Sequence, residues 1–232
     1  MRRFSIYSPL LLLATSAPCV AQTASEDSQP VLELFNGRDL AGWHVYVGEP
    51  AVDPADMWRV EDGLLRATGV GKGYVRTEMA YADYKLQLQW RWPAEPGNSG
   101  VMVNIVNRDE LWPKSFEAQL KSGDAGFFAS FVDARSNEEI VSRNPQGVST
   151  GRLPRPGPSR EKPVGEWNTY EIVLAGDTIT LAVNGEQVNR MTGVRPSAGM
   201  IGLQAEGSAI DFRQITLTPL PPAKDMYAPM PQ

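Results

Sequence analysis

The sequence predicts an all-β fold in which antiparallel strands form a sandwich or a barrel, and three observations support this prediction. Short segments in which apolar and polar residues alternate recur along the whole chain, and this period of two is typical of strands with one buried face. Tight-turn pairs separate the segments, with Asn-Gly at residues 36–37 and 184–185 and Asp-Gly at residues 62–63. Glycine (21 residues) and proline (19 residues) are frequent for a helical protein, and no segment has a convincing amphipathic helical pattern.

The predicted strands follow one another at short intervals, as expected for a sandwich or a barrel. In the segment 98–106, Val101, Val103 and Ile105 are expected to point inward, with Met102 and Asn104 on the opposite face. The predicted strands are residues 31–35, 42–47, 57–61, 64–68, 74–77, 84–92, 98–106, 115–121, 167–175, 178–183, 186–191, 200–204 and 210–217.

One predicted strand, residues 115–121, has an unusual outer face. Its inward positions are apolar, whereas the alternate positions hold a carboxylate, an amide and an amine, namely Glu117, Gln119 and Lys121. A solvated face usually varies its polar residues without such grouping, so this row is a candidate ligand-facing surface. On the strand that begins at residue 200, Gln204 and Glu206 have the same parity and can share a face with this row. An ordinary exposed sheet face, with Glu206 as a turn residue, is the alternative.

Residues 133–164 interrupt the strand pattern because they are rich in arginine and proline. A loop of this length is uncommon inside a compact domain and is often functional, for example as a lid. A solvated excursion without a role is the alternative.

The first 21 residues are expected to be an export signal. Two arginines near the start precede a short apolar run, and small residues suit cleavage after Ala21. The run is too short and too interrupted by proline for a transmembrane helix. Lipidation at Cys19, the single cysteine, is the alternative, although Pro18 directly before it fits that signal poorly. We therefore expect a periplasmic or secreted protein.

The remaining chain is expected to hold one folded domain. Residues 22–30 are a polar linker, residues 31–220 form the domain, and residues 221–232 are a proline-rich tail that is expected to be loosely ordered. With 42% hydrophobic residues, the chain can bury a sizeable core. The sequence does not indicate an oligomeric state.

Composition also limits the chemistry. A net charge of −5 disfavours nucleic acid binding, because contact with phosphate needs a basic face. His44 is the only histidine, so a zinc or iron site built on a histidine cluster is excluded, and His44 is expected to be an ordinary strand residue. Thiol chemistry is excluded if Cys19 is removed with the signal. No cofactor is required, and any metal would have oxygen ligands, with calcium as the natural candidate.

Several motifs recur in this order in one protein family. They are LFNGRDLAGW (34–43), WRVEDGLL (58–65), YADYKLQLQWR (81–91), GNSGVMV (97–103), KPVGEWNTYEI (162–172), VNGEQVN (183–189), IGLQAEG (201–207) and IDFRQITL (210–217). On these motifs the chain resembles the 3-keto-disaccharide hydrolase domain family over about residues 31–220. Single motifs such as EDG are weak, whereas the ordered set is specific. The chain departs from its branch at Asn104, where other members often have histidine, and at Phe127-Phe128, where they often have Asp-Phe-Trp.

The resemblance implies a concanavalin A-like jelly roll of two antiparallel sheets, one of them concave. It also implies a substrate class, glycosides oxidised to a ketone at carbon 3 of the sugar. The ketone acidifies the hydrogen on carbon 2, and the enolate that forms can expel the glycosidic oxygen from carbon 1. Such a site needs a base and a group that stabilises the enolate oxygen.

For this chemistry Glu117 is the preferred base, and Lys121 or Lys114 could stabilise developing negative charge. Glu206 is the second acid. Direct hydrolysis by the Glu117 and Glu206 pair is the alternative to elimination. The expected substrate contacts are Gln119, Gln204, Asn98, Asn104, Lys114, Trp112 and Arg76.

Trp112, which lies in a loop before the polar strand, is expected to stack on a sugar ring, whereas Trp43, Trp58 and Trp167 are expected in the core. Asn98 is equally well explained as a turn residue. A non-catalytic carbohydrate-binding module on the same fold is the alternative function, and a cell-surface scaffold is a weaker third.

Overall fold

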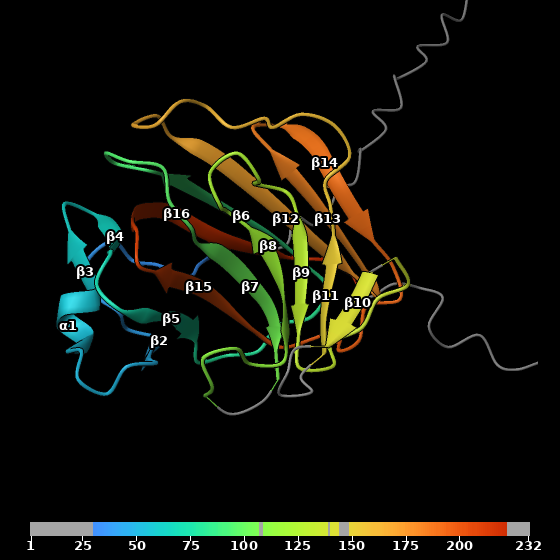
Figure 1. The fold of residues 1–232 in the computed structure, drawn as a ribbon, viewed down its shortest axis with the longest axis horizontal. Helices are drawn as coiled ribbons and strands as arrows, with labels where there is room; N and C mark the ends of the chain where they lie inside the picture. The colour runs from blue at the N-terminus through green and yellow to red at the C-terminus, as the bar shows by residue number, and fades with distance from the viewer. Residues whose placement is uncertain (1–29, 107–108, 139, 144–148, 222–232) are drawn as a thin grey trace, which may run out of the picture.

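Two antiparallel sheets packed face to face form the molecule, which confirms the predicted all-β, two-sheet architecture (Figure 1). The structure is a computed structural model that describes residues 30–106, 109–138, 140–143 and 149–221. The expected signal peptide, nearly all of the linker and nearly all of the tail therefore lie outside the described residues. Within the described residues, no helix has the length and apolar character that a membrane crossing requires.

Sheet A contains the strands with the most regular alternation of buried and partly exposed residues. Along β6 (Tyr84–Arg91) every second side chain is buried, and the pattern repeats along β12 (Asn168–Ala175). The strand order is β14 (Glu186–Met191), β13 (Thr178–Val183), β12, β6, β16 (Ala209–Pro219), β4 (Leu64–Thr68) and β3 (Trp58–Glu61), and β1 (Leu32–Glu33) pairs with β16.

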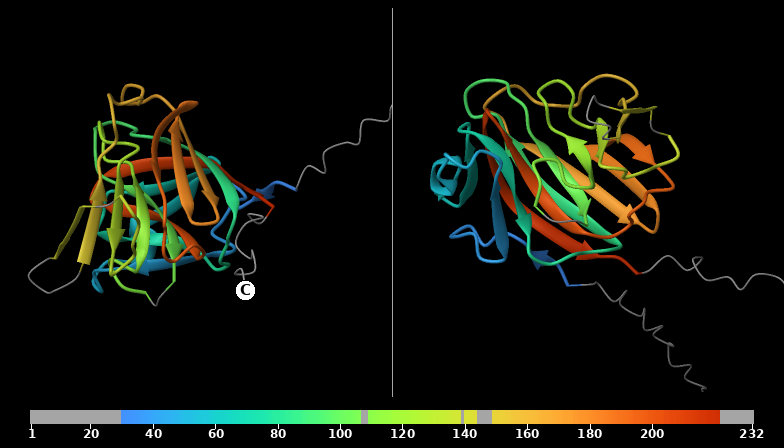
Figure 2. Two further views of the ribbon diagram at one scale, coloured as in Figure 1. Left: turned by 90° about the vertical axis from the view of Figure 1, so that its right-hand side faces the viewer. Right: turned by 60° about the horizontal axis from the view of Figure 1, so that its bottom comes forward.

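Sheet B lies against sheet A and runs across Figure 1 from β2 to β10. Its order is β10 (Ile140–Arg143), β11 (Ser149–Leu153), β9 (Phe128–Phe131), β8 (Ser115–Gln119), β7 (Gly100–Ile105), β15 (Met200–Glu206), β5 (Lys72–Thr77) and β2 (Trp43–Val47). Both ends of the described domain lie together, since β1 is paired with β16 (Figure 2).

The hydrophobic core fills the space between the sheets. From sheet B it receives Phe116, Ala118 and Leu120, which are fully buried and confirm the predicted inward face of that segment. From sheet A it receives the inward residues of β6 and β12, including Trp90 and Tyr170, whose rings lie 5.3 Å apart. The polar alternate residues of β8 must therefore face away from sheet A, onto the outer face of sheet B.

A β-bulge in β7 overturns one prediction. Met200 pairs with Ile105 but Gly202 pairs with Met102, so two residues of β7 oppose one of β15, and Asn104 takes a positive φ of 59°. Side chains after the bulge change face. Val101 and Val103 point into the core as expected, whereas Ile105 packs instead with Tyr74 and Met102 on the outer face of sheet B.

The prediction of a long loop over residues 133–164 is wrong. Two strands, β10 and β11, lie inside it and extend sheet B beyond β9, and β9 itself was also missed. A single helical turn, α1 (Pro54–Met57), was missed as well. It begins where the side chain of Asp53 accepts a hydrogen bond from Ala55 N, with proline at the first helical position.

Candidate active site

Strand pairing gathers polar residues into rows on the outer face of sheet B, because residues directly opposite in neighbouring antiparallel strands point to the same side. Glu117 pairs with Met102 on one side and Ala129 on the other, and Ala129 pairs with Arg152. On β15, Gln204 lies two residues beyond Gly202, the partner of Met102, and it pairs with Tyr74 on β5. A carboxylate, an amide and a guanidinium from strands far apart in sequence thus lie on one surface.

A cavity of about 240 Å³ opens on this surface. One wall is aromatic and the rest is polar or small. It is lined by Asn98, Trp112, Glu117, Gln119, Phe127, Ala129, Phe131, Thr150, Gly151, Arg152 and Glu206.

Glu117 lines the cavity, and its surroundings favour the neutral form of its carboxyl. Only 3% of the residue is exposed, and no described residue forms a hydrogen bond with Oε1. Burial and, to a lesser extent, the negative charge of Glu206 together raise the pKa of Glu117 to about 8, against the opposing effect of Arg152. A buried carboxyl without a partner is unfavourable for folding, so its retention points to a ligand that supplies the partner.

Glu206 and Asn98 also line the cavity. The Nδ2 group of Asn98 donates a hydrogen bond to Oε2 of Glu206, and burial raises the pKa of Glu206 while Lys72 opposes this effect. The Oδ1 atom of Asn98 is buried without a hydrogen-bond partner among the described residues. This pair therefore combines a carboxylate with an acceptor that a ligand hydroxyl can use.

Gly100 leaves the space in which Glu117 and Gln204 meet. A Cβ atom at this position would collide with Oε1 and Cγ of Glu117 and with Oε1 of Gln204. Gln204 is 1% exposed, and neither its oxygen nor its nitrogen has a hydrogen-bond partner among the described residues. Because Gly100 has no side chain, Glu117 and Gln204, both of which have polar atoms without partners among the described residues, can lie side by side.

Arg152 is a site residue that the sequence interpretation missed. It lies on β11, directly opposite Ala129, and faces the same cavity as Glu117. The only signal for this placement is the alternation of Thr150 and Arg152 with Gly151 and Leu153. That signal is short and lies among prolines, so the segment was interpreted as a loop.

Trp112 lies where the sequence interpretation expected a sugar platform. Its ring stacks on Phe131 at 5.3 Å between centroids and 22° between planes, and the half-buried side chain lines the cavity. Among the other tryptophans, Trp43 and Trp58 are in the core as predicted. Trp167 is not, because it lies on the outer face of sheet A under the guanidinium groups of Arg91 and Arg213.

Five of the expected site residues do not line this cavity, and one of them, Gln204, lies buried beside Glu117. Lys121 lies past the end of β8, with a side chain 60% exposed and 3.8 Å from Asp124. It lines a neighbouring hollow of about 250 Å³, to which Gln119 and Arg152 of the cavity also belong. Lys114 does not line the cavity. Asn104 donates to the carbonyl of Pro196 at 2.8 Å because the bulge redirects it. Arg76 lies three strands away from Glu117 and binds Asp109 at 2.9 Å.

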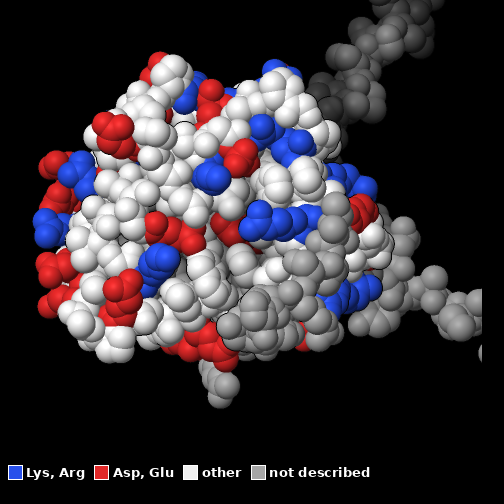
Figure 3. Space-filling model, viewed as in Figure 1, with Lys and Arg blue, Asp and Glu red and all other residues white. Residues whose placement is uncertain are grey.

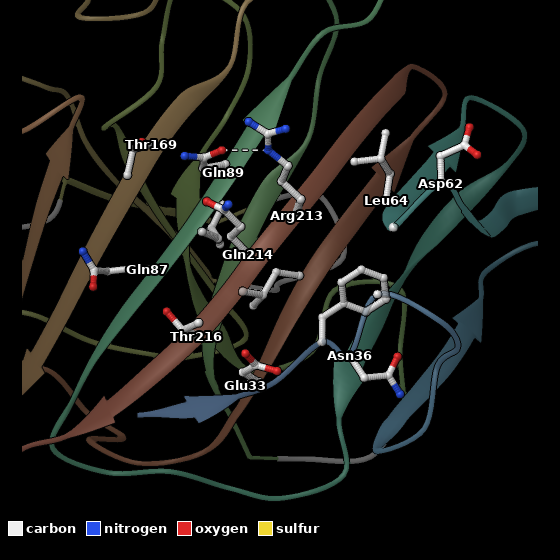
Figure 4. A pocket seen from close by; sticks show the side chains of 15 residues that line it. Glu33, Asn36, Asp62, Leu64, Gln87, Gln89, Thr169, Arg213, Gln214 and Thr216 are labelled. Atoms are coloured by element: carbon white, nitrogen blue, oxygen red, sulfur yellow. Dashed lines mark hydrogen bonds between the residues drawn. The ribbon is translucent and has the colours of Figure 1, made fainter. Parts of the chain in front are cut away.

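A second, larger hollow of about 700 Å³ lies on the outer face of sheet A (Figure 4). Its polar groups come from β1, β6, β12 and β16 and from the turns at Asn36 and Asp62, and several bond to neighbouring side chains. Arg213 Nε donates to Gln89 at 2.8 Å, and Gln87 donates to Glu171 at 3.2 Å. No described buried polar atom without a partner lines this hollow.

Charge on the face shown in Figure 3 is mixed, with acidic and basic groups scattered over a mostly uncharged surface. Across the described ranges, no group of three or more histidine, cysteine, aspartate or glutamate side chains is placed to hold a metal ion.

Comparison with known proteins places this domain. The sequence profile of the 3-keto-alpha-glucoside-1,2-lyase-like domain matches residues 31–218. A 3-keto-disaccharide hydrolase from Bacteroides thetaiotaomicron is 24% identical over 181 residues, which covers 70% of this chain and 58% of that protein. The chain thus spans little more than half the length of that relative.

Solved structures of low sequence identity share the fold. A proposed glycosyl hydrolase from Parabacteroides distasonis superposes with a TM-score of 0.60 at 20% identity, covering 82% of this chain and 94% of that one. The carbohydrate-binding module CBM66 from Bacillus subtilis superposes with a TM-score of 0.51 at 12% identity, covering 76% and 95%. Since the sequence profile of the 3-keto-alpha-glucoside-1,2-lyase-like domain matches most of the chain, the protein belongs to this family.

Proposed function

We propose that this domain is an exported enzyme that cleaves the glycosidic bond of 3-keto-glycosides in the cavity on sheet B. The observation on which the proposal rests is the protonated, unpartnered carboxyl of Glu117, buried beside the second carboxyl of Glu206. Family membership and the name of the Bacteroides relative support the 3-keto substrate. The mixed, mostly uncharged face suits a neutral, hydroxyl-rich ligand.

The two carboxyls have different roles in this proposal. Two neighbouring carboxyls whose environments separate their pKa values divide acid and base work between them. Glu117, being neutral, donates a hydrogen bond to the ketone oxygen on carbon 3 of the sugar. Glu206, the first of the two to ionise, takes the proton from carbon 2. This assignment reverses the sequence-based one, in which Glu117 was the base.

Cleavage follows from the enolate. Removal of the carbon 2 proton places the electron pair of that C–H bond in an enolate, whose oxygen Glu117 stabilises. When the ketone re-forms, a double bond forms between carbons 1 and 2 and the C1–O bond breaks, and the departing oxygen takes a proton from Glu206 or water. Addition of water across the new double bond converts this elimination into net hydrolysis.

The other cavity residues have supporting roles in the proposal. Arg152, rather than Lys121 or Lys114, supplies positive charge near the developing enolate. Trp112 provides an aromatic face against the sugar ring. Asn98 has an unpaired amide oxygen for a sugar hydroxyl, and the buried Gln204 packs behind Glu117.

A chromogenic 3-keto-glucoside tests the proposal. The wild-type protein should release the chromophore, and Glu206→Gln, which removes the base, should lose roughly 10²- to 10⁴-fold in kcat while still binding the sugar. Parallel reactions with added calcium and with a chelator test whether an oxygen-ligated metal takes part. Product analysis separates elimination from hydrolysis. Sugar binding without chromophore release in any condition would instead identify a carbohydrate-binding module.

A further inference from the structure

A short segment, Asp109–Pro113, crosses the outer face of sheet B, and we call it the strap. The side chain of Leu111 lies over Gly48, just beyond β2, because a Cβ atom on Gly48 would be 2.8 Å from Leu111 Cδ1. The ring of the next residue, Trp112, stacks on Phe131 of β9. These two consecutive side chains therefore contact parts of sheet B that are separated by four strands in the sheet order.

The strap divides the outer face into a filled half and an open half. In the filled half, Tyr74, Met102 and Ile105 form a small hydrophobic cluster in which each residue is at most 1% exposed. Tyr46 stacks on Tyr74 at 5.0 Å in the same half. The open half, from β8 to β11, contains the cavity, and Trp112 lies at the boundary between the two.

Three charged or titratable side chains hold the start of the strap. The carboxylate of Asp109 bridges two partners, with Oδ1 2.9 Å from Nε of Arg76 and Oδ2 2.7 Å from Nε2 of His44. His44 pairs with Arg76 across β2 and β5, so both partners rise from neighbouring positions on rigid strands. His44, expected to be an ordinary strand residue, is therefore part of the anchor through its contact with Asp109.

We propose that His44, Arg76 and Asp109 are positioning residues that fix Trp112 as the wall of the sugar cavity. The inference rests on the proposed function and concerns the same site. Trp112 lies three residues from Asp109, and the buried Pro113 follows it, so the ring is held between the anchor and β8. With the strap in place the cavity ends at Trp112, which limits it to a short glycoside. Release of the strap would leave the ring free to turn away from the sugar.

The test measures KM and kcat of the full chain on a chromogenic 3-keto-glucoside for Asp109→Asn, Trp112→Phe and the double variant. Asp109→Asn should raise KM by about tenfold with kcat within about threefold, and its effect should not add to that of Trp112→Phe, because both act through one ring. His44→Ala should raise KM in the same way. His44→Gln, whose amide can still donate to Asp109, should restore it.

Asp211→Asn is the matched control. Asp211 also bridges two cations, Arg66 at 3.0 Å and Arg91 at 2.9 Å, but it lies on sheet A and away from the cavity. An equal rise of KM in this control, additive effects of the Asp109 and Trp112 variants, or a KM within about twofold of wild type in Asp109→Asn would each overturn the proposal. If Asp109→Asn does not fold, an unchanged KM in His44→Ala would overturn the proposal instead.

Fluorescence separates this inference from the proposed function. If the wild-type protein releases no chromophore, the proposed function fails, and the strap is then judged without substrate. The emission of Trp112, taken as the difference between each protein and its Trp112→Phe counterpart, should shift in Asp109→Asn and stay unchanged in Asp211→Asn. An unshifted emission in Asp109→Asn would refute the anchor.

Discussion

The two hollows described on this molecule differ in whether their polar groups have hydrogen-bond partners, and their volumes do not show this difference. The hollow on sheet A has about three times the volume of the cavity on sheet B, about 700 Å³ against about 240 Å³. In the larger one, Arg213 and Gln89 form a hydrogen bond with each other on an open surface. In the smaller one, Glu117 is 3% exposed and Oε1 has no hydrogen-bond partner among the described residues.

Unsatisfied polar groups are the better guide to function. A buried donor or acceptor without a partner costs on the order of 1–3 kcal/mol of folding free energy, more when it is ionised. The surface of sheet A avoids this cost because its amides and charges pair with one another. In the cavity on sheet B, Oε1 of Glu117 and Oδ1 of Asn98 have no hydrogen-bond partner among the described residues, and neither does the amide of Gln204 behind Glu117. A ligand rich in hydroxyl groups would satisfy the two atoms that line the cavity.

Filling the gap between the unpaired groups should have the largest effect. Gly100→Ala places a methyl group where Glu117 and Gln204 meet, so Glu117 must move. We expect kcat/KM on the chromogenic 3-keto-glucoside to fall by roughly 100-fold, because a displacement of about 1 Å can cost that much, and stability to fall by about 1–3 kcal/mol.

Gly202→Ala is the matched control for this substitution. Its methyl group would meet the flexible ends of Met102 and Ile105 at 3.0 Å in the filled half of the face. Gly202→Ala should lower the stability of the fold by a comparable amount and reduce kcat/KM only slightly. Equal losses of activity in both variants would show that general overpacking, and not the meeting of Glu117 and Gln204, is responsible.

The raised pKa of Glu117 predicts two opposite pH dependences. As pH rises, activity should decrease, whereas the stability of Glu117→Gln relative to wild type should increase. Because the folded-state pKa is about 8 and the ordinary value is 4.5, the folded protein holds one more proton than the unfolded chain between these values. Its stability should therefore decrease as pH rises from about 4.5 to 8. Glu117→Gln lacks this penalty, so its stability relative to wild type should increase over the same window by on the order of a few kcal/mol. Thermal unfolding of both proteins at pH 5, 6.5 and 8 measures it.

Activity should follow the same proton. If Glu117 acts as the neutral donor, kcat/KM falls as pH rises through about 8. A kcat/KM that instead rises through pH 8 would mean that the ionised form is active, and it would restore Glu117 as the base.

The sequence predicted most of the fold because alternation is a local signal. The strands at 64–68, 178–183 and 186–191 begin and end at the predicted residues. Strands β10 and β11 were missed because proline and arginine obscure their alternation, and β9 was missed because it is only four residues long. They extend the sheet in sequence, since β9 pairs with β8, β11 with β9 and β10 with β11. The bulge at Asn104 was missed because it depends on the register with β15.

The candidate site was predictable only as a set of residue types. Alternation placed Glu117, Gln119, Gln204 and Glu206 on one face, and the structure brings them together. The protonation of Glu117 could not be predicted, since it requires burial by segments distant in sequence. Likewise, the anchor of His44, Arg76 and Asp109 joins three separate segments of the chain, so no local sequence pattern predicts it.

The smallest effect is expected on sheet A, where Gln89→Ala removes one wall of the larger hollow. Gln89 is a partly exposed residue that accepts one hydrogen bond, so its loss should cost about 0.5–1.5 kcal/mol of stability at most. Arg213 should stay in place because its guanidinium lies 3.9 Å above the ring of Trp167. Turnover of the chromogenic 3-keto-glucoside should therefore remain within about twofold of wild type, the noise expected for independent distant sites. A tenfold loss would mean that the hollow on sheet A takes part in the reaction, and that paired polar groups on an open face do not exclude function.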